Sequence, residues 1–146
     1  MMGALADAAL AGGGEVVGVI PRAMVDREVA HDGATELVVV STMHERKEEM
    51  SARADAFLTL PGGTGTLDEF VEALSWTQLG LHAKPSGLLN ADGFYDGLVA
   101  YLGRAAGDGY LPADFDQLLL VDADVDRLLD RLSGWEPPAA RRWLTE

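Results

Sequence analysis

The residues best suited to do chemistry in this 146-residue sequence form one glycine-rich run, PGGTGTLDE, over residues 61–69. A short apolar run ends just before it and helical spacing of apolar residues follows it, which predicts a strand leading into a helix. Glycines at such a point give the backbone access to positive φ and to close approach by a ligand. The free amides and the dipole of a helix start favour an anion such as a phosphate. The run therefore predicts an anion site, and a glycine turn that only reverses the chain is the alternative.

The run differs from the two common nucleotide loops. A P-loop has a lysine after its last glycine, and this sequence has none there. The dinucleotide fingerprint G-x-G-x-x-G lacks its third glycine, because Asp68 stands in that place. Thr64 and Thr66 would add hydroxyl donors, so a phosphate monoester is the anion that the run suits.

Two charged residues near this run are candidates for catalysis. Glu69, expected in the first turn of the helix, can serve the helix dipole, stabilise positive charge on a substrate or activate a water. Arg46, on the helix after the preceding strand, can fork onto phosphate or ribose oxygens, or it can be a solvated surface residue. His44 is a candidate general acid or a support for the Arg46 helix.

Strands and helices must alternate to position these residues. We expect strands at 16–20, 37–40, 56–60, 86–90 and 117–121 and helices at 3–11, 43–54, 67–79, 95–106 and 124–132. Short buried strands between helices indicate right-handed βαβ units. The fold class is therefore α/β, a Rossmann-like doubly wound parallel sheet with helices on both faces. We expect a single domain over residues 1–146 with a loose tail at 134–146.

Composition excludes several classes of protein. The 24 acidic and 11 basic residues give a net charge of −13, which disfavours a general nucleic-acid binder. No apolar run approaches the roughly 20 residues that cross a bilayer, so no membrane partner is expected. The chain has no cysteine, which fits a cytoplasmic location.

Several blocks together resemble the LONELY GUY family of cytokinin riboside 5'-monophosphate phosphoribohydrolases. The central pattern is PGGxGTxxE at 61–69, preceded by Met43–Lys47. Further matching blocks are Gly18–Pro21, Asp55–Phe57, Trp76–Gly80, Lys84–Pro85 and Leu88–Asn90. Family members cleave the N-glycosidic bond of a nucleoside 5'-monophosphate and release a free base and ribose 5-phosphate, without a metal or other cofactor.

The resemblance also implies roles for single residues. Arg46 and Glu69 would form the catalytic pair. The residues implied in substrate and phosphate binding are Glu28, Lys47, Gly62, Gly63, Thr64, Gly65, Thr66, Leu67 and Asp68. The family further implies a homodimer, for which the helix face around Trp76 is suited, although Trp76 can also pack in the core or stack on a base.

Other readings compete with this one. Proteins with this motif have carried a lysine decarboxylase label, but no lysine environment suited to pyridoxal can be identified. Similar folds bind nucleotides or molybdenum cofactor without hydrolysis, and the pair Arg46 and Glu69 speaks against a pure carrier. The family has about forty to fifty residues ahead of the point that matches Met2, so we expect this chain to lack the first strands of the domain.

Overall fold

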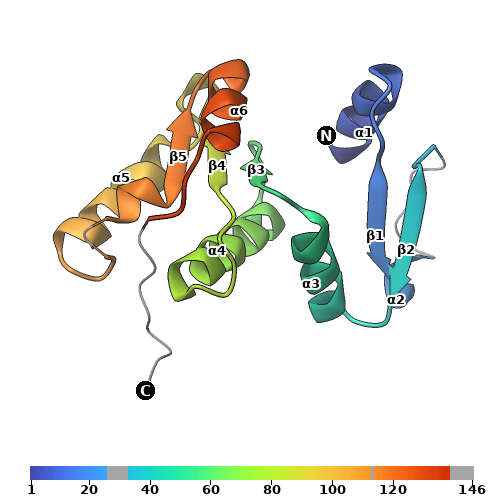
Figure 1. The fold of residues 1–146 in the computed structure, drawn as a ribbon, viewed down its shortest axis with the longest axis horizontal. Coiled ribbons are helices and arrows are strands. Elements are labelled where there is room, and N and C mark those ends of the chain that lie inside the picture. The colour runs from blue at the N-terminus through green and yellow to red at the C-terminus, as the bar shows by residue number, and fades with distance from the viewer. Residues whose placement is uncertain (26–32, 113, 139–146) are drawn as a thin grey trace. The chain divides into compact units, whose positions relative to one another are not determined.

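A computed structural model of the protein describes residues 1–25, 33–112 and 114–138 (Figure 1). The chain divides into two compact units, Met1–Ala54 and the part that begins at Asp55. Of the helices in the described ranges, none is both long and apolar enough to cross a membrane.

In its described residues, 1–25 and 33–54, the first unit is a pair of parallel strands with three helices. Its elements are α1 (Met2–Ala11), β1 (Val17–Pro21), α2 (Arg22–Val25), β2 (Glu36–Val40) and α3 (Met43–Arg53). Strands β1 and β2 pair in parallel from Val17 opposite Glu36 to Pro21 opposite Val40. Thr42 caps α3, since the Glu45 amide donates to Thr42 Oγ1 over 3.1 Å. The Ser41 amide donates in turn to the Glu45 carboxylate over 2.7 Å.

The second unit is a three-stranded parallel sheet in the order β3-β4-β5. Its elements are β3 (Phe57–Thr59), α4 (Thr64–Leu79), β4 (Ser86–Leu89), η1 (Ala91–Gly93), α5 (Asp96–Gly107), η2 (Phe115–Gln117), β5 (Leu119–Asp122) and α6 (Val125–Ser133). In the central strand, Leu88 lies between Thr59 of β3 and Val121 of β5. The glycine-rich run and the segments after β4 and β5 therefore share the carboxyl edge of this sheet.

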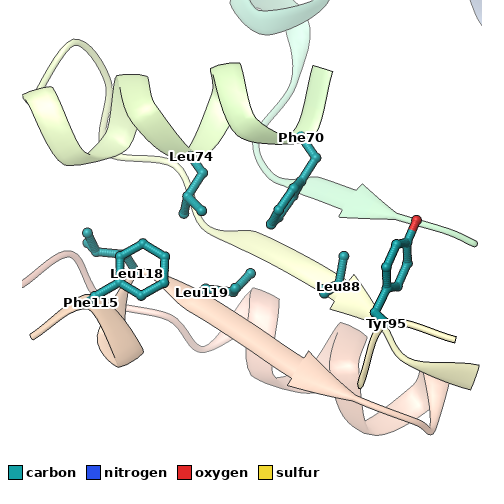
Figure 2. Packing of buried hydrophobic residues seen from close by; sticks show 7 residues of the cluster. All are labelled: Phe70, Leu74, Leu88, Tyr95, Phe115, Leu118 and Leu119. Atoms are coloured by element: carbon teal, nitrogen blue, oxygen red, sulfur yellow. The ribbon is translucent and has the colours of Figure 1, made fainter. Parts of the chain in front are cut away.

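Helices cover both faces of the second sheet. On one face, Leu88 and Leu119 pack with Phe70 and Leu74 of α4 and with the ring of Tyr95, as Figure 2 shows. On the other face, Leu120 packs with Leu128 and Leu132 of α6. Successive residues of a strand point to opposite faces, so Leu119 and Leu120 serve different helices.

The predicted fold class is confirmed, because every strand pair in the described ranges is parallel and helices cover both faces of the β3-β4-β5 sheet. The strands form two sheets, one in each unit. A single domain over residues 1–146 stays a prediction.

The segment at 134–146 stays a prediction as a loose tail, and one of its first residues contacts the rest of the second unit. The indole N–H of Trp135 donates to the carbonyl of Gln117 over 2.8 Å, and the ring packs beside Leu120, Leu128 and Leu132. Trp135 is half-buried, and packing of its ring with its one donor satisfied holds this part of the chain on α6. Residues 139–146 lie outside the described ranges.

Candidate functional site

The glycine-rich run at 61–69 divides into a short turn and the first six residues of a helix. Helix α4 begins at Thr64 with Gly63 as its N-cap, three residues before the start predicted at Leu67. The first helical hydrogen bond joins the Leu67 amide to the Gly63 carbonyl over 3.1 Å. Glycine and threonine are weak helix formers, which is why the sequence pattern placed them in the turn.

The glycines of the run are explained by space. The run does not use the access to positive φ that glycine gives, because the glycines with positive φ in the described ranges are Gly13, Gly80, Gly93 and Gly109. A Cβ added to Gly62 would lie 2.8 Å from the Cβ of Thr66. The threonine side chain therefore occupies the place that a side chain at Gly62 would need.

Gly63 and Gly65 border open space. A Cβ at either position would meet no atom within 4 Å, and both residues are exposed. The amides of Thr64, Gly65 and Thr66 precede the first helical hydrogen bond, so the helix backbone does not use them. Gly63 supplies no capping side chain, and the first turn of α4 holds no acidic residue. This bare, partly positive helix start can accept an anion.

The two acidic residues of the run lie beyond this first turn. The prediction that Glu69 stands in the first turn is wrong, because α4 starts earlier than expected and Glu69 is its sixth residue. Glu69 is half-buried, next to the buried Phe70, whereas Asp68 is exposed. Glu69 therefore lies outside the first three helical positions, N1–N3, where an acidic residue interacts most strongly with the helix dipole.

The predicted residues of the first unit lie on α3. Arg46 and Lys47 are both half-buried, and a guanidinium nitrogen of Arg46 lies 4.0 Å from the sulfur of Met43. His44 is exposed, and its Nε2 lies 3.1 Å from the carboxylate of Glu48, one turn along α3. This contact favours the role of His44 as a support for the helix that carries Arg46. Glu28 lies outside the described residues.

The structure therefore brings together one group of predicted residues in the second unit. These are Gly62, Gly63, Thr64, Gly65, Thr66, Leu67, Asp68 and Glu69, all on the turn and the first two turns of α4. Arg46 and Lys47 are neighbours on α3 in the other unit, and their catalytic and binding roles stay predictions.

Trp76 lies far along α4 from the glycine turn. It is ten residues after Thr66, which corresponds to about 15 Å along a helix axis. Its ring is half-buried and stands edge-on to His82, with ring centroids 6.2 Å apart. Burial, followed by the charge of Lys84, lowers the pKa of His82, so this contact is with a neutral imidazole at neutral pH. The contact favours packing for Trp76 over stacking on a base.

Sequence reasoning missed two residues that hold the glycine turn. The hydroxyl of Tyr95 donates to the carbonyl of Leu60 over 2.7 Å, directly before the turn. The amide of Tyr95 donates to Asn90 Oδ1 over 2.7 Å. Burial raises the pKa of Tyr95, and a backbone hydrogen bond with Gly62 opposes that rise, so the hydroxyl is protonated at neutral pH. Leu88–Asn90 was noted only as a matching block, which carried no sign of this contact.

Metal chemistry has no evident ligand set in the described ranges. There, no group of three or more His, Asp or Glu residues is placed to hold a metal ion.

Comparisons with known proteins address the same region. A family model described as "possible lysine decarboxylase" matches residues 2–132, which is most of the chain. The chain belongs to this family. It is 47% identical over 137 residues to a rice protein named "probable cytokinin riboside 5'-monophosphate phosphoribohydrolase LOGL9". It is 41% identical over 137 residues to the Arabidopsis thaliana cytokinin riboside 5'-monophosphate phosphoribohydrolase LOG2.

These family relatives are longer than the chain. The matches cover 94% of this chain but 60% of the rice protein and 64% of the Arabidopsis protein. The predicted resemblance to the phosphoribohydrolases is confirmed at the level of the family.

Proposed function

We propose that this chain carries the catalytic region of a phosphoribohydrolase that acts on cytokinin riboside 5'-monophosphates and on AMP. The carrying observation is the bare start of α4, where Gly63 and Gly65 leave open space beside unused amides. This suits the terminal phosphate of a nucleotide. Support for the reaction comes from relatives 38–47% identical that are named phosphoribohydrolases.

The reaction is hydrolysis of one bond. Water adds to the anomeric carbon of the ribose while the bond from that carbon to the base nitrogen breaks. The bonding electrons leave with the base, which takes up a proton as the water loses one. Positive charge develops on the ribose in the transition state, as in glycoside hydrolysis.

The site residues at the start of α4 have the following proposed roles. The amides of Thr64, Gly65 and Thr66 bind the phosphate, and the two threonine hydroxyls add donors. Glu69 stabilises the positive charge on the ribose, because a carboxylate held near a developing cation acts without reorganisation. The Asp68 side chain offers acceptor oxygens, so we assign it to a ribose hydroxyl and not to the phosphate.

The roles proposed for Arg46, Lys47 and Glu28 rest on the resemblance. A guanidinium at position 46 can bind phosphate or ribose oxygens through two parallel hydrogen bonds, which a lysine cannot reproduce. Arg46→Lys is therefore expected to lower turnover, and the same substitution at Arg53 is its control because Arg53 is held by Glu36 and Glu49.

The direct test is release of free base and ribose 5-phosphate from isopentenyladenosine monophosphate by this chain. Glu69→Ala is expected to lower kcat about a hundredfold or more while ribose 5-phosphate still binds, since loss of one electrostatic stabiliser has that size. Glu72→Gln, one turn further along α4, is the matched control and should retain turnover. Undiminished turnover in Glu69→Ala would contradict the assignment.

The alternative is a protein that binds nucleotides or molybdenum cofactor without hydrolysis. It predicts tight binding of the nucleotide with no release of base over hours, whatever residue stands at position 69. The lysine decarboxylase description predicts release of carbon dioxide from lysine, which the same preparation can be tested for.

We also propose a homodimer in the cytoplasm. Val71 and Leu79, both about half exposed, place apolar side chains on the outer surface of α4. Such side chains suit an interface between two copies. Light scattering is expected to give twice the chain mass, and Leu79→Glu should reduce it to one; a monomeric wild type would contradict the dimer.

A further inference from the structure

The turn before α4 has little means of fixing its own shape. Pro61 has no amide proton, and Gly62 and Gly63 have no side chains. Ordering a glycine costs more conformational entropy than ordering any other residue. A phosphate site built on this turn therefore needs contacts from elsewhere in the fold.

Tyr95 provides such contacts from the hydrophobic core beside the turn. Its hydroxyl donates to the Leu60 carbonyl over 2.7 Å, and a backbone hydrogen bond joins it to Gly62. A phenol can donate one hydrogen bond and accept another, so one oxygen can hold the residues on both sides of Pro61. Figure 2 shows the Tyr95 oxygen directed toward the segment that leaves β3.

The ring of Tyr95 is itself firmly placed. It is 3% exposed and belongs to the cluster that includes Phe70 and Leu88. The ring of Phe94 stands edge-on to the ring of Tyr95, with the two ring centroids 4.9 Å apart. Because Phe70 lies on α4, the ring contacts the same hydrophobic cluster as the helix whose start forms the proposed phosphate site.

The backbone after β4 is bent to place Tyr95 there. Asp92 has φ 52° and Gly93 has φ 71°, which is the left-handed region that residues other than glycine seldom adopt. Asn90 holds this bend, since its side-chain oxygen accepts from the Tyr95 amide and its nitrogen donates to Asp96 over 2.8 Å. The Asn90 amide donates to the Asp122 carbonyl over 2.8 Å, which joins the bend to the end of β5.

From these contacts we infer that Tyr95 is a positioning residue for the phosphate site: its hydroxyl, held by the Asn90 bend, fixes the turn at residues 60–63 in the shape that presents the α4 amides to a phosphate. Tyr95 acts through the backbone and does not contact the substrate. The inference rests on the proposed function for the identity of the ligand, whereas its structural part concerns the turn alone.

The test compares Tyr95→Phe with Tyr101→Phe in the full chain. Both substitutions remove one hydroxyl, and Tyr101 lies on α5 with 67% of its surface exposed. Tyr95→Phe is expected to weaken ribose 5-phosphate binding, measured by calorimetry, about tenfold, the size of one lost hydrogen bond. Tyr101→Phe should bind as the wild type does. In turnover, KM for the nucleotide should rise and kcat should stay nearly constant.

Hydrogen exchange at the amides of Gly62 and Gly63 provides the readout that needs no ligand. Tyr95→Phe should speed exchange at these amides about tenfold through local opening, with no change in β4 and β5. A general loss of stability would speed exchange in the strands as well. Unchanged exchange at Gly62 and Gly63 would overturn the inference.

The two proposals fail in different ways. Equal ribose 5-phosphate binding by the wild type and Tyr95→Phe would overturn the positioning role and leave the proposed function standing. A wild type that binds no ribose 5-phosphate would overturn the proposed function. Hydrogen exchange at the Gly62 amide in Tyr95→Phe would then test separately whether Tyr95 fixes the turn. If Tyr95→Phe does not fold, Asn90→Ala replaces it and should weaken binding severalfold; unchanged binding in that variant would overturn the inference.

Discussion

Helices α4 and α6 both follow a strand of the same parallel sheet, yet their first turns are filled differently. At α6, Asp124 caps the helix by accepting from the Arg127 amide over 2.9 Å, and Asp126 adds a second acid. At α4, the N-cap is Gly63 and the first turn has no acid. Both starts lie at the carboxyl edge, where ligands bind in folds of this class.

The difference separates what stability requires from what binding requires. A capping carboxylate satisfies the free amides of a helix and stabilises it by about 1 kcal/mol relative to alanine. The start of α6 is stabilised in this way. Because the Asp124 carboxylate occupies the place beside its amides, an anion cannot bind there. The α4 start has neither the cap nor the negative charge, which is the arrangement that a phosphate-binding helix needs.

Filling the α4 start should have the largest effect. Gly63→Asp would place a capping carboxylate in open space, as at Asp124. The helix should be at least as stable, while ribose 5-phosphate binding should weaken about a hundredfold or more because two negative charges would compete for the same amides. Calorimetry measures the affinity and thermal unfolding the stability. The neutral control Gly63→Asn should lose less affinity; full affinity in Gly63→Asp would refute the assignment of the site.

Replacement of Gly62 should have the next largest effect. The new methyl group of Gly62→Ala would collide with the side chain of Thr66, and overpacking of this kind costs about 1–3 kcal/mol. Gly65→Ala, at a helical position with open space, should instead stabilise the protein by about 0.5–1 kcal/mol. Urea unfolding measures both changes in the free energy of unfolding. Changes of the same sign would contradict the difference in space around Gly62 and Gly65.

Emptying the α6 start should have a smaller effect. Asp124→Ala removes the cap and is expected to reduce the free energy of unfolding by about 1 kcal/mol. Phosphate binding at α4 should not change, and no new anion site should form at α6 because Asp122 and Asp126 remain. Urea unfolding and ribose 5-phosphate titration check these two outcomes, and a gain of phosphate binding at α6 would break the contrast between the helices.

The smallest effect concerns pH at the α6 start. Hydrogen bonds from Arg127 and from the Asp124 amide lower the pKa of Asp122 from 3.8 to about 2. Since the folded-state pKa is depressed, the stability it contributes is complete above about pH 4 and is lost as pH falls toward 2. Asp122→Asn should therefore lower Tm slightly at pH 7 and less at pH 3. A gap in Tm that widens at pH 3 would contradict this linkage.

Much of the architecture could be predicted because its signals are local. Each β-branched or leucine run became a strand, and Thr42 and Asp124 stand at helix starts that short-range rules locate. The left-handed cap at Gly80, with φ 74°, is equally local. For the same reason, the sequence predicts that the glycine-rich run leaves a strand and enters a helix, which β3 and α4 confirm.

The remaining features either run against local propensity or depend on a contact between distant residues. The start of α4 at Thr64 requires the Gly63 carbonyl to accept the first helical bond, against the weak helix propensity of glycine and threonine. The hold of Tyr95 on Leu60 joins residues 35 positions apart and depends on the pairing of β3 with β4. Neither propensity nor spacing carries information on such a contact.

An NMR titration of the isotopically labelled protein with ribose 5-phosphate tests the central claim most directly. We expect saturable shifts of the amide resonances of Thr64, Gly65 and Thr66 at the bare start of α4. The amides of Val125 and Asp126 at the start of α6 should not move. Shifts confined to α6, or none at residues 63–66 with millimolar ligand, would contradict the assignment of the phosphate site.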